Sequence, residues 1–286
     1  MLFLVLWASG FGVAKIGLRY AEPMTLLALR FGLIVLISVA TLLVLRPALP
    51  RRRVDWLHLA VVGFLIQSVY FGLAYLGMSL GVSAGTAAVL AALQPLLVAL
   101  ASPLVTGERV GWIRRIGLLL GAAGSALVVV ADSSFDGRLD AGVIFCLGSA
   151  LGMAAATLYQ KRFAVAAHPV VVNLVHYAVG VATVGPLALA LEHTPVVWSG
   201  ALAVALAWLV GANSLVAVSL LLFMIARSEA SRVSSLFFLV PPVAALFGWL
   251  LLGERMSLGS GMGVVAAIAG VFLVGRADRS ASPRAG

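Results

Sequence analysis

The chain has 286 residues, of which 63% are hydrophobic and only 10% charged, and its mean hydropathy is +1.14. This composition excludes a soluble globular domain, in which about 25% of residues are charged. A net charge of +9 would suggest a nucleic-acid partner in a soluble protein. In a membrane protein it reports topology instead, so no nucleic-acid partner is expected.

Apolar stretches of about 18 to 25 residues follow one another along the chain, each long enough to cross roughly 30 Å of hydrocarbon as a helix. They predict an all-α membrane protein with ten transmembrane helices. The expected spans are 2–18, 24–45, 56–78, 83–105 and 112–131, followed by 141–162, 170–191, 202–224, 229–252 and 257–275. Residues 2–18 are expected to be a retained span, because no basic residue precedes them as in a cleaved signal.

The two halves of the chain repeat each other at a constant shift of 146 residues. Lys15 falls on Lys161, Pro23 on Pro169, Pro95 on Pro241, Gln67-Ser68 on Asn213-Ser214, and Gly107-Glu108-Arg109 on Gly253-Glu254-Arg255. Internal symmetry of this kind is typical of secondary transporters. The sequence therefore predicts two five-helix repeats, at residues 1–132 and 139–278.

The basic residues indicate how the repeats are oriented. Of the nineteen Lys and Arg residues, fourteen lie on the side that holds both predicted termini, four on the other side, and Arg30 lies inside a span. The positive-inside rule makes both termini cytoplasmic in a multi-pass inner-membrane protein. Because five spans per repeat is an odd number, the second repeat is expected to be inverted relative to the first.

Several motifs are similar to those of a known family: Trp7-Ala8-Ser9-Gly10-Phe11, Arg30-Phe31, and the two series from Pro95 to Gly107-Glu108-Arg109 and from Pro241 to Gly253-Glu254-Arg255. The chain resembles the EamA-type branch of the drug/metabolite transporter superfamily along nearly its whole length. The resemblance implies a ten-helix carrier that exports amino acids, other metabolites or toxic organic compounds by alternating access. Its substrate would occupy a central cavity between the repeats. These motifs identify the fold rather than the cargo.

Polar side chains near the middle of a span are the best indicators of a substrate path, because hydrocarbon offers them no partner. We expect Gln67, Gln94, Asn213 and Ser214 to face the cavity and offer neutral donors and acceptors to a ligand. The alternative is that the amides only bond neighbouring helices, at about 0.6 to 2 kcal/mol per contact.

Aromatic side chains follow Gln67 along its helix. Tyr70, Phe71 and Tyr75 are expected to line the cavity, and Trp7 and Tyr159 could extend this surface. Such a lining suits a solute with an apolar or ring-bearing side chain. The alternative is packing against lipid or at the membrane interface.

Charged groups inside or at the ends of spans also fall in pairs under the shift. Arg30 would attract a carboxylate of the substrate, and His176 would titrate and couple transport to protons. The alternative for both is a structural role, in which neighbouring helices hold the side chain. Candidates for gating are Lys15, Lys161, Glu108 and Glu254, although charges at helix ends are usually only solvated. All ten acidic residues lie in connections or at span ends, which favours a facilitative carrier or coupling through a group at the end of a span.

Close helix packing and kinks complete the expectations. Gly117-xxx-Gly121 and Gly259-xxx-Gly263 predict close packing against helices of the same repeat or across a dimer, so the protein is a monomer or a homodimer. Two spans are interrupted by proline: span 83–105 by Pro95 and span 229–252 by Pro241-Pro242. The prolines either kink these helices beside the substrate site or only curve them.

We find no catalytic or metal-binding motif and expect neither an enzyme nor a cofactor. The sequence indicates a carrier in the lipid bilayer that exports a small-molecule substrate, with aromatic or aliphatic amino acids first. Alternatives of the same fold are an exporter of drugs or quaternary ammonium compounds and a nucleotide-sugar-type carrier. Outside transport, a membrane scaffold or receptor is the alternative. A channel would need a longer polar stripe.

Overall fold

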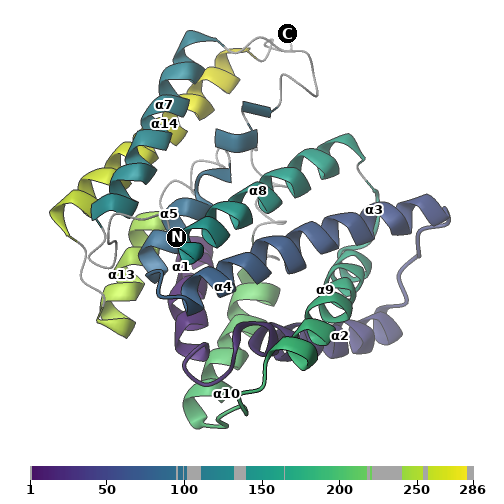
Figure 1. Ribbon diagram of the computed structural model, residues 1–286. Coiled ribbons are helices and arrows are strands. Elements are labelled where there is room, and N and C mark those ends of the chain that lie inside the picture. The colour runs from purple at the N-terminus through teal and green to yellow at the C-terminus, as the bar shows by residue number, and fades with distance from the viewer. Residues whose placement is uncertain are drawn as a thin grey trace.

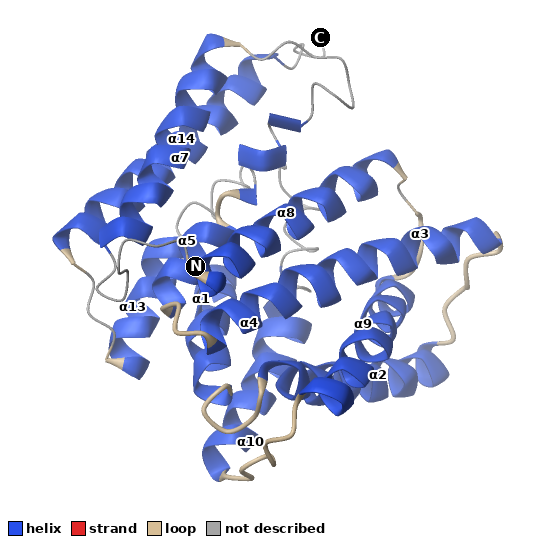
Figure 2. Cartoon of the chain, viewed as in Figure 1, coloured by secondary structure: helices blue, strands red, loops and turns tan. Residues whose placement is uncertain are grey.

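The computed structural model describes residues 2–94, 96–98, 100–101, 111–131, 140–163, 165–217, 220, 240–253 and 257–281. All regular secondary structure in these residues is helical (Figure 2). Within them, five helices are long and apolar enough to cross a membrane: Pro23–Leu45, Arg53–Ser79, Ala141–Gln160, Pro169–Leu191 and Gly200–Ala217. Shorter apolar helices accompany them.

The helices follow the predicted spans wherever the chain is described. In order they are α1 (Leu2–Gly17), α2 (Pro23–Leu45), α3 (Arg53–Gly63), η1 (Phe64–Phe71), α4 (Gly72–Ser79), α5 (Ala84–Ala91), α7 (Trp112–Ala131), α8 (Ala141–Arg162), α9 (Pro169–Leu191), α10 (Gly200–Ala207), η2 (Trp208–Ala217), α13 (Val240–Leu252) and α14 (Leu258–Ala281). Parts of spans 83–105, 202–224 and 229–252 lie outside the described residues. So does Pro95, whereas Pro241 and Pro242 lie in the first turn of α13.

Two spans contain π-helical segments that the sequence did not predict. α3, η1 and α4 form one helix, and η1 is its π-helical middle. α10 continues into η2 in the same way. Because π-helical turns are rare and frequently occur at functional sites, they direct attention to the polar residues they carry. The buried ones with amide or aliphatic hydroxyl side chains are Gln67 in η1 and Asn213 with Ser214 in η2.

α1 lies in the middle of the bundle (Figure 1). Although it begins the chain, it packs against η2, α10 and α13 from the second half as well as α5 and α4 from the first. α8 does the reverse and packs against α3, η1, α4 and α5. The two halves of the chain therefore share one core, in which Leu26, Leu27 and Phe31 of α2 are completely buried.

α2 and α9 run side by side and cap each other at one end (Figure 1). The Glu192 carboxylate accepts hydrogen bonds from the backbone N–H groups of Met24 and Thr25, each at 2.7 Å. Glu22 accepts one from the backbone N–H of Thr194 at 2.8 Å. Hydrogen bonding to Thr194 lowers the pKa of Glu22, so this carboxylate stays ionised beside the start of α2.

α7 and α14 form a pair along one edge of the bundle (Figure 1). A Cβ added to Gly124 would lie 2.3 Å from the backbone nitrogen of Ala267, and one added to Gly270 would lie 2.3 Å from that of Gly121. The prediction of close glycine packing is confirmed, and a Cβ added to Gly121 would lie 2.2 Å from Leu96 Cδ1 of the same half. The contact of α7 with α14 was not predicted. These faces join the two halves within one chain, because the shared core brings the last span of each half to the same edge.

Candidate functional site

A buried arginine on α2 joins both halves of the chain. Arg30 is 1% exposed. Its Nη1 donates to the Tyr75 hydroxyl at 2.9 Å, and its Nη2 donates to Asn213 Oδ1 at 3.0 Å and to Ser214 Oγ at 2.9 Å. The guanidinium also lies 4.7 Å from the centre of the Phe71 ring. Arg30 does not snorkel to the membrane surface; it ties α2 and α4 to η2.

All three hydrogen-bond acceptors of Arg30 are neutral. Its Nε is buried without a partner. The described part of the chain places no carboxylate against the guanidinium, so its positive charge stays uncompensated there. A buried charge without a counter-charge is costly in a membrane, where insertion of an arginine at mid-depth costs about 2.5 to 3.5 kcal/mol on biological scales. Such a group is well placed to bind an anion.

Asn213 extends the network to α1. Its Nδ2 donates to the backbone carbonyl of Leu6 at 3.1 Å and to that of Trp7 at 3.3 Å. Nearby, Trp208 Nε1 donates to Ser9 Oγ at 2.9 Å. Asn213 is thus fixed by α1 on one side and holds Arg30 on the other, which determines how the guanidinium is oriented.

A cavity of about 30 Å³ lies beside this network. It is lined by Trp7, Gly10, Phe11, Ala14, Arg30, Tyr70, Phe71, Ala74, Tyr75, Met78 and Asn213. The structure therefore describes a small site with aromatic walls and a guanidinium on one side.

The structure brings many of the sequence-predicted site residues together here. Trp7, Tyr70, Phe71, Tyr75, Arg30 and Asn213 line the cavity, and Ser214 bonds to Arg30. Phe11 and Ala14 also line it and were missed, since apolar residues in a span carry no signal that separates cavity walls from other packing.

Gln67 and His176 lie elsewhere, at the interface of α3 and η1 with α9. A Cβ added to Gly180 of α9 would lie 2.8 Å from the Cβ of Gln67, and one added to Gly63 would lie 2.7 Å from the Cα of His176. Neither residue lines the Arg30 cavity. The Gln67 Oε1 and the His176 Nε2 are both buried without a hydrogen-bond partner. Both residues therefore belong to the contact with α9 rather than to the Arg30 cavity.

Gln94 and Tyr159 also lie away from the cavity, at contacts of α8. The Gln94 Nε2 donates to Thr157 Oγ1 at 3.0 Å. The Tyr159 hydroxyl is 2.9 Å from His58 Nδ1. For Gln94 the structure shows the bond between helices that the sequence had left as the alternative.

The expected gating residues are only partly described. Lys15, near the end of α1, donates from Nζ to the backbone carbonyl of Val82 at 2.6 Å. Glu108, Glu254 and the side chain of Lys161 lie outside the described residues. Among the residues that are described, no group of His, Cys, Asp and Glu could hold a metal ion.

Gly10 of α1 makes the closest approach to the network. A Cβ at this position would lie 2.6 Å from Asn213 Nδ2. We expect Gly10→Ala to displace the Asn213 amide, misplace Arg30 and lower transport about tenfold, since small misplacements of a binding group are costly. Gly12→Ala in the same helix is the matched control, because its Cβ would meet Phe247 at an ordinary 3.4 Å. Initial uptake rates in proteoliposomes measure the effect; equal rates for the two variants would contradict this role of Gly10.

Apolar helices of membrane length around a small polar centre define a multi-pass membrane transporter. The chain belongs to the EamA-like transporter family, whose model matches residues 1–130 and again 140–276. The resemblance seen in the sequence is thus confirmed.

Relatives of this chain include named exporters. It is 25% identical to a "Probable amino-acid metabolite efflux pump" of Escherichia coli, over 96% of this chain and 92% of that protein. It is 28% identical to a "Probable terminal-alkyne amino-acid exporter" of Streptantibioticus cattleyicolor, with the same coverage. A WAT1-related chloroplast protein of Arabidopsis thaliana is 26% identical over 94% of this chain, which spans only 66% of that relative's length. A crystal structure of a protein with 21% sequence identity has the same fold, with a TM-score of 0.69 over 98% of this chain and 96% of the other.

Proposed function

We propose that this chain is an inner-membrane carrier that exports amino acids with aromatic or aliphatic side chains. Ten transmembrane helices would form two inverted repeats, 1–132 and 139–278, with both termini in the cytoplasm. Alternating access would expose the cavity between the repeats to each side in turn. One relative is named as a probable amino-acid metabolite efflux pump and another as a probable terminal-alkyne amino-acid exporter, which supports this substrate class.

The observation that carries the proposal is that Arg30 has no counter-charge among the residues that the structure describes. A substrate carboxylate would supply the missing anion and could accept two parallel N–H bonds from the guanidinium. A quaternary ammonium compound would instead meet a buried positive charge, which disfavours the drug-exporter alternative. A nucleotide sugar would require further basic groups for its diphosphate, and Arg30 is the basic residue among those that line the cavity.

Substrate binding would exchange the partners of Arg30. The carboxylate would take the Nη2 donor from Asn213 and Ser214 and engage the unpartnered Nε. Asn213 Oδ1, once released, could accept from the substrate ammonium group. The side chain of the substrate would lie against Tyr70 and Phe71, and the 30 Å³ cavity must widen to admit it.

The positions of the π-helical segments support an inverted-repeat carrier. η1 spans Phe64–Phe71 and η2 spans Trp208–Ala217, so the two coincide closely under the 146-residue shift. Discontinuous or irregular helices in corresponding positions of two repeats often surround the binding site of a transporter. The interleaving of α1 and α8 with the opposite halves of the chain agrees with such symmetry.

The test uses substrates that differ only at the carboxylate. Uptake of labelled phenylalanine and of labelled phenylalaninamide by wild-type protein in proteoliposomes is compared. Leucine, threonine and a quaternary ammonium dye are measured as further substrates. Each measurement is made with and without a pH gradient. Loss of a charge-assisted hydrogen-bond partner costs about 1.5 to 3 kcal/mol, so phenylalanine should be preferred over its amide by about 10- to 150-fold. Uptake should not depend on the gradient.

Each other outcome has a definite meaning. Equal uptake of phenylalanine and the amide would contradict carboxylate binding, and uptake of the dye alone would make the protein a drug exporter. A steep response to the pH gradient would contradict facilitative transport. Uptake of none of these compounds would favour the scaffold or receptor alternative.

A further inference from the structure

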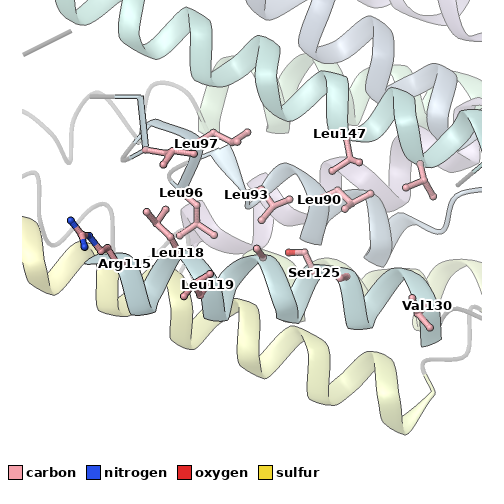
Figure 3. A pocket seen from close by; sticks show the side chains of 14 residues that line it. Leu90, Leu93, Leu96, Leu97, Arg115, Leu118, Leu119, Ser125, Val130 and Leu147 are labelled. Carbon is pink, nitrogen blue, oxygen red and sulfur yellow. The ribbon is translucent and has the colours of Figure 1, made fainter. Parts of the chain in front are cut away.

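A second cavity of about 760 Å³ lies between α5, α7 and α8 (Figure 3). It shares no lining residue with the Arg30 cavity. Figure 3 shows Leu93 and Leu96, which follow α5 in the chain, facing Leu118 and Leu119 of α7 across it. Its lining is apolar except for Arg115 and Ser125. The α7–α14 pair therefore leaves an aliphatic cleft between itself and the rest of the bundle.

The cleft is elongated and opens toward the lipid side of the bundle. Its lining runs along α7 from Arg115 to Val130, a distance of about 22 Å at 1.5 Å per residue. This exceeds half of the roughly 30 Å hydrocarbon core, so the cleft reaches from headgroup level past mid-depth. Leu100, Leu119 and Val130 in its lining are 58%, 72% and 61% exposed.

The size of the cleft indicates what kind of molecule fits. Its volume divided by its length gives a mean cross-section of about 35 Å². The cleft is therefore long and narrow, a shape that takes an extended alkyl chain.

The charge at one end indicates the headgroup. Arg115 is exposed in the first turn of α7, at the end of the cleft that the basic residues assign to the cytoplasmic leaflet (Figure 3). Trp112, one turn before it, is 73% exposed, as expected of an aromatic residue at the membrane interface. A cation at this depth complements the phosphate of an anionic lipid.

We propose that this cleft binds one anionic phospholipid, with an acyl chain between α5, α7 and α8 and its headgroup at Arg115. The lipid would complete the packing of the α7–α14 pair against the bundle. The assignment is independent of the transported substrate, because the two cavities share no residue.

The experiment measures lipid retained by the full-length protein. Purified protein is incubated in mild detergent with equimolar phosphatidylglycerol and phosphatidylcholine, and bound lipid and oligomeric state are read by native mass spectrometry. Wild type should retain one lipid, with phosphatidylglycerol preferred about fivefold, the effect expected of one basic residue near an anionic headgroup. Arg115→Gln should abolish this preference and leave chain binding intact.

Two neighbouring substitutions on α7 locate the lipid. Ala122 lines the cleft and is exposed, so Ala122→Trp should fill the cleft and reduce retention of both lipids at least tenfold. Ala123 is also exposed but does not line the cleft, so Ala123→Trp is the matched control and should behave as wild type. Thermal unfolding without added lipid verifies that each variant is folded.

Three outcomes would overturn the proposal. Equal retention of both lipids by wild type would remove the role of Arg115. Equal retention by the Ala122→Trp and Ala123→Trp variants would place the lipid outside the cleft. The third outcome is a wild-type dimer without bound lipid that the Ala122→Trp variant does not form. The occupant of the cleft would then be a second copy of the chain. If Ala122→Trp does not fold, Leu93→Trp on the α5 side fills the same cleft.

Discussion

Replacing Arg30 by glutamine is expected to reduce phenylalanine transport at least about 100-fold, which is near the upper range for loss of a charge-assisted hydrogen bond. The variant should also lose the preference for phenylalanine over phenylalaninamide. Arg30→Lys should be intermediate, because lysine keeps the charge but not the planar pair of donors that matches a carboxylate. Initial uptake rates of both substrates in proteoliposomes measure these effects.

A structural role for Arg30 predicts a different result. Because a buried charge is costly, replacing it by a neutral group of similar length should leave thermal stability unchanged or raise it. If Arg30 serves only to hold α2 to η2, stability should fall, while the residual activity should still discriminate between phenylalanine and its amide. Arg51→Gln is the control, since it removes the same charge from an exposed connection between α2 and α3. Should Arg30→Gln fail to fold, Tyr75→Phe removes one partner of the guanidinium and tests the same network.

Gly270→Val should destabilise the protein by about 3 kcal/mol or more. Its Cβ would lie 2.3 Å from the backbone nitrogen of Gly121 and 2.6 Å from the carbonyl oxygen of Gly117. Backbone atoms cannot move aside as the end of a flexible side chain can, so α14 must separate from α7 along its length. Overpacking of a side chain usually costs about 1 to 3 kcal/mol, and contact with backbone places this site at the upper end of that range.

The matched control for this change lies in the same helix. A Cβ added to Gly261 would have no neighbour within 4 Å among the described residues, so Gly261→Val should change stability by no more than about 0.5 kcal/mol. Both substitutions have the same effect on helix propensity, so their difference isolates the α7–α14 contact. Unfolding in mixed micelles, followed by circular dichroism, measures it. Equal stability of the two variants would show that α14 does not pack on α7 in this way.

Much of the membrane architecture is readable from the residues alone. Span length and apolarity are local properties, because each membrane helix must satisfy its own backbone hydrogen bonds. The described helices accordingly follow the expected spans. The resemblance to the family rested on the motifs at Trp7, Arg30, Pro95 and Pro241 together with the internal duplication, and the family is confirmed.

Assignment of cavity residues required the tertiary structure. Gln67 and Asn213 are equivalent under the 146-residue shift, yet only Asn213 lines the Arg30 cavity. The cause is a long-range contact, since Gly180 of α9 lets η1 approach so closely that Gln67 packs there. Hydrophobic periodicity does not reveal which face of an apolar span meets which neighbour, because lipid and protein interior are equally apolar.

The sequence by itself determined the membrane class and the approximate spans, because these follow from the length and composition of each segment. Its motifs indicated the family. It also brought Arg30 to attention as a charge inside a span, but left its role open between structure and transport. Only the tertiary structure decided that Arg30 faces neutral partners from both halves of the chain and an aromatic cavity. The same holds for the α7–α14 pair and the cleft beside it, because contacts between distant helices depend on how all of them pack together.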